Sequence, residues 1–437
     1  MLQTIKNVFK IPDLKKKILF TALFLVLYRL GSFIPTPGVN TAALKEFFRV
    51  QSQTGGNTLF DMFNLFVGGN FERASIFALG IMPYITASIV IQLLGGIIPY
   101  FEKLKKEGPA GQKKINQITR YGTVFIGIFN ALGMVVFLQN AGPNVVTINP
   151  ALFSFTTIVS MITGTMVILW LGEQITEYGI GNGVSMIIFA GIIARYPEGF
   201  LSMFNMVAWG GMSIMTCLIV IAVMLLVTAA VIFVTEATRR IHVQYPKRVV
   251  GRKAYGGRST YIPLKVNTAG VIPIIFAQSV MMMPATIATF FRNSAFADVI
   301  QRYLAPATTL YTLLYMALIV FFAYFYTAIV MNPTEMAENM KKHGGHVYGH
   351  KPGKPTAEYI NNILKSITLP GAIFFAIIAV IPEFMMKWTN IPFYFGGTGI
   401  IIIVGVALET LNQIESHLVM RHYDGFMKKG KLRGRSS

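Results

Sequence analysis

The apolar segment VAWGGMSIMTCLIVIAVMLLVTAAVIFVT (residues 207–235) and the basic loop TRRIHVQYPKRVVGRKAYGGRSTYIPLKVN (238–267) that follows it decide the fold class. The segment contains no charged residue, and about 20 apolar residues are enough to cross the hydrocarbon core of a bilayer. The loop contains eight Lys and Arg residues within 30 positions. An uncharged stretch of this length, followed closely by a basic loop, predicts a helix that crosses a membrane and has positive charge on one side.

The composition of the whole chain extends this interpretation. Of 437 residues, 54% are hydrophobic and 13% are charged, whereas a soluble domain carries about 25% charged residues. We therefore expect an all-α, multi-pass membrane protein with ten transmembrane helices, at residues 18–35, 74–98, 119–140, 152–172, 184–204, 207–235, 269–291, 307–330, 367–386 and 393–414. The fifth segment is the least regular, because Arg195, Pro197 and Glu198 interrupt it.

The positions of the basic residues predict the orientation. With ten spans, both termini and every second loop lie on one side of the membrane, and that side holds 30 of the 38 Lys and Arg residues. The positive-inside rule places this side in the cytosol. The N-terminal MLQTIKNVFKIPDLKKK (1–17) is basic and amphipathic and lacks a small-residue cleavage site, so we expect a retained helix at the cytosolic surface.

Two further basic loops, 101–117 and 332–359, lie on the same predicted side as 238–267. A pore for a small solute needs no external surface of this size. The three loops therefore predict docking of a large partner in the cytosol.

The sequence argues against several other classes. It has no Ser-His-Asp order, no Walker loop and no paired inward carboxylates, so we do not expect an enzyme. None of the six His residues lies near the middle of a span, where an ion-coupled transporter usually keeps an ionisable group. The nearest metal-like spacing, His343, His346 and His350, lies in a Gly-rich loop without adjacent Cys or carboxylates. We expect no cofactor, no metal and, with the single Cys217, no internal disulfide.

Two features of the sequence allow more than one interpretation. Residues 57–73 form a Phe-rich stretch that is too short to span, which fits either an interfacial helix or a re-entrant segment covered by protein. In the second span, Ile81, Ile85 and Ile89 recur every four residues and share one helix face. That face could pack in a bundle, meet lipid or line a pore.

Seven motifs resemble the SecY family, the pore subunits of bacterial protein-translocation channels. They occur in the family's order and together extend over essentially the whole chain: RLGSFIPTPGVN (29–40), FALGIMPYITASI (77–89), WLGEQITEYGIGNG (170–183), PLKVNTAGVIPIIFA (263–277), NPTEMAENMKK (332–342), PGKPTAEYI (352–360) and PFYFGGTGIIIIVGVALE (392–409). So many long matches are more specific than any single motif.

The resemblance implies two halves of five spans, residues 1–205 and 206–437, related by inverted pseudo-symmetry. It implies a short re-entrant plug helix at about 58–71, which includes Phe60, Asp61, Phe63, Asn64, Phe66, Gly68 and Gly69. It also implies an apolar ring at the waist of the pore, formed by Ile81, Ile85, Val184, Ile188, Ile275 and Ile402. Val184 stands where the family leads us to expect isoleucine.

The resemblance further implies a function and partners. We expect a protein-conducting channel of the bacterial plasma membrane, with a lateral gate between spans two and three and spans seven and eight, and with Gln92 and Asn267 as its polar residues. The implied partners are the SecE and SecG subunits, the SecA ATPase, the ribosome, signal sequences and lipids, with docking at Arg252, Lys253 and Lys351. Lys351 replaces the family's usual arginine. The alternative is a secondary transporter of a small solute.

Overall fold

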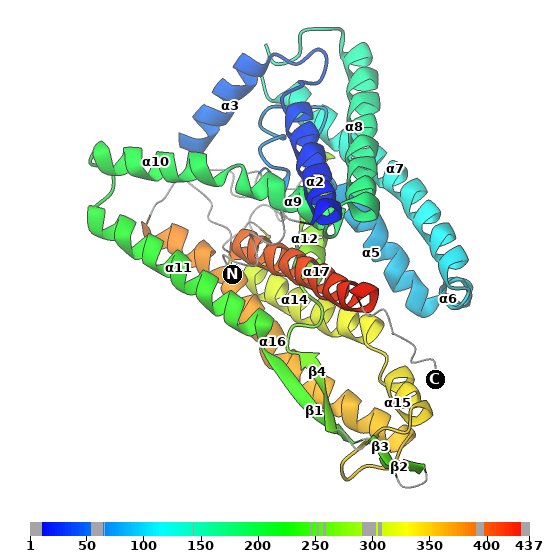
Figure 1. Ribbon diagram of the computed structural model, residues 1–437. Coiled ribbons are helices and arrows are strands. Elements are labelled where there is room, and N and C mark those ends of the chain that lie inside the picture. The colour runs from blue at the N-terminus through cyan, green and yellow to red at the C-terminus, as the bar shows by residue number, and fades with distance from the viewer. Residues whose placement is uncertain are drawn as a thin grey trace. The chain divides into compact units, whose positions relative to one another are not determined.

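The computed structural model describes residues 11–53, 64, 66–142, 144–244, 247–250, 253–256, 259–290, 303–304, 308–389 and 397–429. These residues form two compact units, which are considered separately below (Figure 1). The first unit comprises the described residues of Met1–Leu201, Thr286–Ala297 and Ile402–Ser437. The second comprises those of Ser202–Ala285 and Asp298–Ile401.

Long apolar helices dominate both units. Each of the ten predicted spans overlaps a described helix. Among the described residues, seven helices are long and apolar enough to cross a membrane, or eight if the pair α5 (Met82–Ile97) and α6 (Pro99–Lys106), bent by 97°, forms one broken span. The all-α membrane fold is therefore confirmed in its main elements, while the number of ten spans stays a prediction.

In the first unit, the helices that pack together come from both ends of the chain. They are α2 (Pro12–Gly31), α5, α6, α7 (Pro109–Asn140), α8 (Pro150–Tyr178), α9 (Gly183–Ile193) and the main part of α17 (Gly397–Lys429). The amphipathic α3 (Thr41–Gln53) covers one end of a core that includes Leu44, Phe71 and Phe137. Close packing depends on glycine at one point, because a methyl group on Gly164 of α8 would overlap the carbonyl oxygen of Ile76.

The fifth predicted span is divided, as its polar interruption suggests. Helix α9 ends at Ile193, and α10 (Tyr196–Ala208) begins three residues later. Arg195 lies in the break, and Glu198 lies in the first turn of α10. The break thus places two charged side chains of opposite sign next to each other along the chain.

The second unit combines helices with a small sheet. Its helices are α11 (Ile214–Glu236), most of α12 (Ile272–Phe290), α14 (Thr309–Val330), α15 (Pro333–Lys342) and α16 (Lys354–Thr389). Strand β1 (Thr238–Gln244) pairs antiparallel with β4 (Ser259–Lys265) and with β5 (His346–Val347), in the order β4-β1-β5. The sheet buries Ile241, Val243 and Leu264 against Met340 of α15 and Ile360 of α16.

The two longest basic loops therefore meet in one structure, which the sequence analysis did not predict. A second hairpin, β2 (Lys247–Val250) with β3 (Lys253–Gly256), extends the loop between β1 and β4. The burial pattern of β1, in which Ile241 and Val243 alternate with exposed Arg240, His242 and Gln244, is typical of a sheet with one face in solvent.

Candidate functional site

The base of the predicted plug packs closely between two helix ends of the first unit. Gly68 has φ +72°, and a methyl group on it would lie 2.7 Å from the Cα of Gly191 in α9. On the other side, a methyl group on Gly80, just before α5, would lie 3.2 Å from Val67. Because glycine has no Cβ, both helix ends can approach the segment this closely. The predicted plug residues Phe60, Asp61 and Phe63 lie outside the described residues.

Five of the six predicted ring residues lie on helices of this same unit or directly before one. Ile81 is the residue before α5, and Ile85 lies in the first turn of that helix. Val184 and Ile188 lie in the first half of α9, and Ile402 lies in α17. Ile81, Ile85, Ile188 and Ile402 are buried, whereas Val184 is partly exposed. Ile275 is buried on α12 in the second unit, so a ring of all six residues stays a prediction.

The start of α5 and the end of α9 are near each other because both contact the plug base. Gly80 precedes Ile81 by one residue, and Gly191 follows Ile188 by three. The segment Val67–Gly68 touches both glycines. Ile81 and Ile188 therefore lie within about one helical turn of the predicted plug, and Ile85 and Val184 lie within about two turns.

Helix α17 contacts the chain around the start of α9. The backbone N–H of Gly181 donates to Oε1 of Gln413 (2.8 Å), and the Thr410 hydroxyl lies 3.5 Å from the Met186 sulfur. The N–H of Ile180 also donates to Thr21 of α2 (3.0 Å), which anchors the α8–α9 turn on a third helix.

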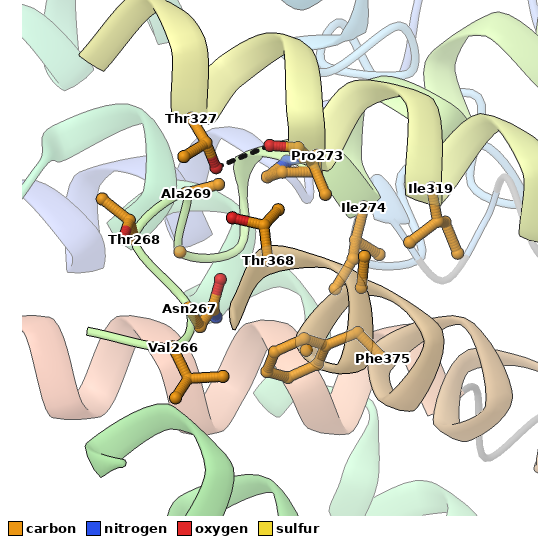
Figure 2. Close-up of a pocket in the computed structure, with 14 residues that line it drawn as sticks. Val266, Asn267, Thr268, Ala269, Pro273, Ile274, Ile319, Thr327, Thr368 and Phe375 are labelled. Carbon is orange, nitrogen blue, oxygen red and sulfur yellow. Dashed lines mark hydrogen bonds between the residues drawn. The ribbon is translucent and has the colours of Figure 1, made fainter. Parts of the chain in front are cut away.

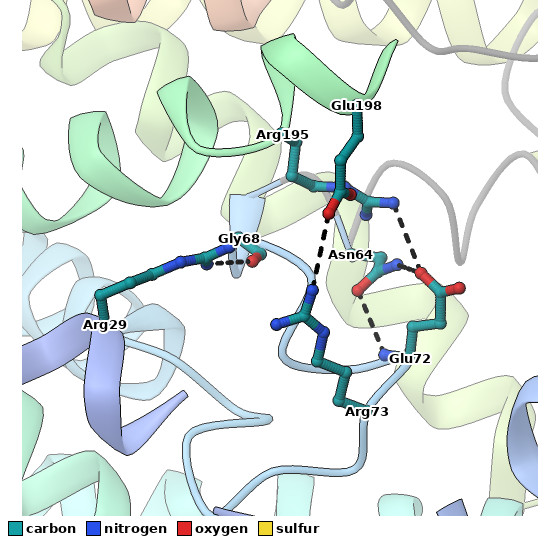
Figure 3. A network of polar contacts seen from close by, with 7 residues as sticks. All are labelled: Arg29, Asn64, Gly68, Glu72, Arg73, Arg195 and Glu198. Carbon is teal, nitrogen blue, oxygen red and sulfur yellow. Dashed lines mark hydrogen bonds and ion pairs between the residues drawn. The ribbon is translucent and has the colours of Figure 1, made fainter. Parts of the chain in front are cut away.

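A polar network holds the plug base to α2 and to the α9–α10 break (Figure 3). Arg29 of α2 donates to the carbonyl oxygen of Gly68 (3.1 Å). Nδ2 of Asn64 donates to Oε2 of Glu72 (2.9 Å), and the N–H of Glu72 donates back to Oδ1 of Asn64 (3.2 Å). Arg195 pairs with the same Glu72 oxygen at 3.4 Å.

A second ion pair flanks the first. Arg73 lies 3.7 Å from Glu198, and its guanidinium stands over the ring of Phe33, 4.6 Å from the ring centre. Arg29 stands over the same ring at 5.4 Å. Cation–π contacts of this kind add about 0.5–1 kcal/mol at partly exposed sites. The network thus joins residues that are up to 125 positions apart in the sequence.

This network is not among the sites predicted from the sequence, where Arg195 and Glu198 only interrupt the fifth predicted span. A usable signal was present, because charged residues of both signs cluster at 72–73 and again at 195–198, and ionisable groups at the ends of spans usually have partners. Their pairing, however, depends on contacts between distant segments.

The two predicted gate residues have different surroundings. Nε2 of Gln92, on α5, donates to the hydroxyl of Ser88 one turn earlier (3.0 Å). Asn267 lies between β4 and α12, and its side chain lines a small hollow of the second unit (Figure 2). The structure does not test their role in a gate.

The predicted docking residues lie in the loops that form the sheets. Lys253 begins β3, and Lys351 is exposed beside the start of α16. The Thr356 hydroxyl donates to the Lys351 carbonyl (2.8 Å) and fixes this turn. Arg252 lies outside the described residues. Within the described part of the chain, no group of three or more His, Cys, Asp or Glu side chains could hold a metal ion.

Comparison with known proteins agrees with the helical membrane fold described above. The sequence profile of the SecY family matches residues 75–411. The protein translocase subunit SecY of Escherichia coli (strain K12) is 46% identical over 427 residues, which cover 97% of this chain and 96% of that protein. The protein translocase subunit SecY of Thermotoga maritima is 42% identical over 438 residues, which cover 100% of both chains.

Solved structures agree in fold. A structure described as a protein conducting channel matches with a TM-score of 0.64 and 20% identity, covering 95% of this chain and 97% of that one. Sec61 in a canine ribosome–channel complex matches with a TM-score of 0.60 and 18% identity, at the same coverage. At these identities the likeness concerns the fold.

The network predicts that Asn64 stabilises the plug base. Asn64 is 5% exposed and makes both side-chain bonds to Glu72. Replacing it by alanine removes both bonds, each worth about 1 kcal/mol. Asn64→Ala should therefore raise the hydrogen-exchange rate of residues 66–72 by about thirtyfold, measured by mass spectrometry on purified protein.

A matched control is available on α7. Asn140 is exposed, and its side chain donates only to the Val136 carbonyl of its own helix (2.8 Å). Asn140→Ala should leave exchange at 66–72 unchanged. Equal exchange in wild type and Asn64→Ala would show that the network does not hold this segment.

Proposed function

This chain belongs to the SecY family and forms a protein-conducting channel in the membrane, and from that premise we propose that it carries unfolded preproteins across the bacterial plasma membrane. It is a channel subunit and not an enzyme. The alternative interpretation, a secondary transporter of a small solute, has no support among the relatives. The observation that carries the proposal is the placement of buried Ile81 and Ile188 within about one turn of the plug base, in the unit that also buries Ile85 and Ile402.

We propose that these residues, with Val184 and Ile275, form the ring at the waist of the pore. A channel for extended polypeptide must still hold back ions when it is at rest. A narrow ring of branched apolar side chains does so by excluding water. Such side chains also fit around polypeptide of any sequence, because they offer no fixed charge to bind it. Val184 is one methylene smaller than isoleucine and should loosen the seal only slightly.

The plug proposal follows from the same contacts. Residues 58–71 would close the pore on its outer side, with the base held by Arg29 and Glu72. The close approach of Gly68 to Gly191 supports this role, because it brings the plug base within one turn of Ile188. This segment would leave its position when a polypeptide enters.

We also propose a lateral gate and the two-half architecture. Spans two and three would separate from spans seven and eight, and transmembrane segments would leave between them into lipid. Gln92 and Asn267 would be polar residues of this gate. The proposed halves are 1–205 and 206–437; the first compact unit ends its longest segment at Leu201 but also includes Thr286–Ala297 and Ile402–Ser437.

The cytosolic partners would be SecA and the ribosome, and SecE and SecG would be the accompanying subunits. The sheet formed by the two basic loops supports a docking role, because it gives them a fixed shape with one exposed face. A relative of the same fold, Sec61, has been solved in a ribosome–channel complex. Arg252, Lys253 and Lys351 would contact these partners, with both termini of the chain in the cytosol.

The ring proposal predicts a change in ion leak. In the triple variant Ile85→Asn, Ile188→Asn, Ile402→Asn, polar side chains should wet the ring, so conductance of the resting channel should rise about tenfold or more. The measurement is single-channel conductance in planar bilayers, with the amount of membrane-inserted protein determined in parallel.

The control for this experiment keeps the ring apolar. The variant Ile85→Leu, Ile188→Leu, Ile402→Leu should be as tight as wild type. If the isoleucines only pack a helix bundle, the Asn variant should be lost from the membrane, because buried unpaired amides destabilise the fold. That loss, or unchanged conductance of a well-inserted Asn variant, would contradict the ring.

The docking proposal predicts a loss of motor-driven transport without loss of folding. The variant Arg252→Glu, Lys253→Glu, Lys351→Glu reverses three charges in the basic loops. Charge reversal in an interface costs several kcal/mol, whereas surface substitutions change folding stability by about 0.5 kcal/mol or less. SecA-driven translocation into vesicles should fall about tenfold or more, while thermal stability should barely change.

Charge reversal on the opposite predicted side provides the control. Lys45→Glu with Arg49→Glu alters α3, which the proposed orientation places outside the cell, and should leave translocation at the wild-type rate. Normal transport by the triple variant would mean that the loop charges only set topology.

A cysteine at Lys253 tests the orientation, since a membrane-impermeant thiol reagent should label it only in opened cells.

A further inference from the structure

A small hollow in the second unit lies between the connector 266–271, which links β4 to α12, and helices α14 and α16 (Figure 2). Its volume is about 20 Å³, which is room for one water molecule. Apolar residues such as Ile319 and Phe375 form part of its wall. The amide of Asn267 and the hydroxyl of Thr368 point into it from opposite elements.

The connector approaches α16 unusually closely at this point. A methyl group on Gly371 of α16 would lie 3.1 Å from the Val266 side chain and 3.3 Å from its carbonyl oxygen. The N–H of Val266 donates to the Ala237 carbonyl at the start of β1 (2.9 Å). The connector is thus fixed to the sheet at Val266, and the following residues run along α16.

Thr368 is a buried residue of α16, and its side chain lines the hollow. Other helix threonines, such as Thr119, Thr123 and Thr327, donate to the carbonyl four residues earlier, at 2.7–2.9 Å. Asn267 is partly buried, and its amide lines the same hollow. A hydroxyl and an amide can each donate to and accept from a water molecule in such a hollow.

We propose that Thr368 is a positioning residue for the connector and acts through one ordered water molecule. The water accepts from or donates to the Thr368 hydroxyl and bonds the Asn267 amide, and it holds residues 266–271 against α16. The hydroxyl of Thr327, which lines the same hollow and already donates to Ala323, offers a further acceptor. A water with two to four polar partners is stable in a site of this size.

One consequence rests on the proposed function. The connector joins the sheet proposed for docking to the helix that carries Ile275. While the water holds Asn267, movement of the sheet is transmitted to α12 only together with α16. Asn267 would therefore be available to the lateral gate only after it leaves Thr368.

The experiment compares Thr368→Val with Thr368→Ser in the complete chain. Valine keeps the volume of threonine but removes the hydroxyl, whereas serine keeps the hydroxyl. Thr368→Val should raise the hydrogen-exchange rate of residues 266–272 by about fivefold, as loss of one hydrogen bond predicts. Thr368→Ser should restore the wild-type rate. A high-resolution cryo-electron microscopy map should show water density between Asn267 and Thr368 in wild type and in Thr368→Ser only.

Each result bears on the proposal directly. A wild-type map without density at this point would overturn it, whatever the variants do, and so would unchanged exchange in Thr368→Val. A direct bond between Asn267 and Thr368 with no water would also overturn it. If Thr368→Val does not fold, the wild-type map still decides. None of these measurements depends on transport through the pore. Failure of the water-bridge proposal can therefore be distinguished from failure of the ring proposal.

Discussion

The structure depends on one constraint, which is that backbone polar groups at membrane depth must find partners inside the protein. The helices meet it by their own hydrogen bonds. The irregular segment between Asn64 and Ile81 meets it partly by its own turns, such as the bond from the Ser75 N–H to the Asn70 carbonyl (3.0 Å), and partly through neighbouring segments. Thr36 donates twice to the Ala74 carbonyl (2.8 Å from the N–H and from the hydroxyl), Ile76 donates to Ile34 (3.0 Å), and Arg29 donates to Gly68 (3.1 Å). Satisfying this segment is what ties α2 to the plug base.

The same segment brings the proposed pore elements together. Because its backbone is held by α2, Val67 and Gly68 can lie directly against Gly80 and Gly191, at the two helices that carry most of the ring residues. The charges stay at the edge of this region, in the pairs that Glu72 and Arg73 make with the α9–α10 break. The ring positions themselves are apolar. A seal by dewetting requires this separation, since a charge at the waist would attract water and ions.

Local sequence patterns predicted the helices well because span length and hydropathy are properties of single segments. The fifth span illustrates this, since Arg195 and Pro197 indicated the break between α9 and α10 before it was seen. Patterns did not predict the sheet, because β1 pairs with β4 across a loop and with β5 from another loop about 100 residues away. They also missed the pairing of Glu72 with Arg195, which joins segments 123 residues apart.

The ring residues were predicted from family resemblance and not from periodicity. A spacing of four identifies a common face for Ile81 and Ile85 but cannot say what that face meets. The most direct test of the central claim is therefore contact with the transported chain. A photo-crosslinking amino acid at Ile85, Ile188 or Ile402 should form adducts with a preprotein arrested during translocation. The same probe at the exposed Phe125 of α7 or Leu218 of α11 should form none. Adducts at the exposed sites but not at the three isoleucines would contradict the account.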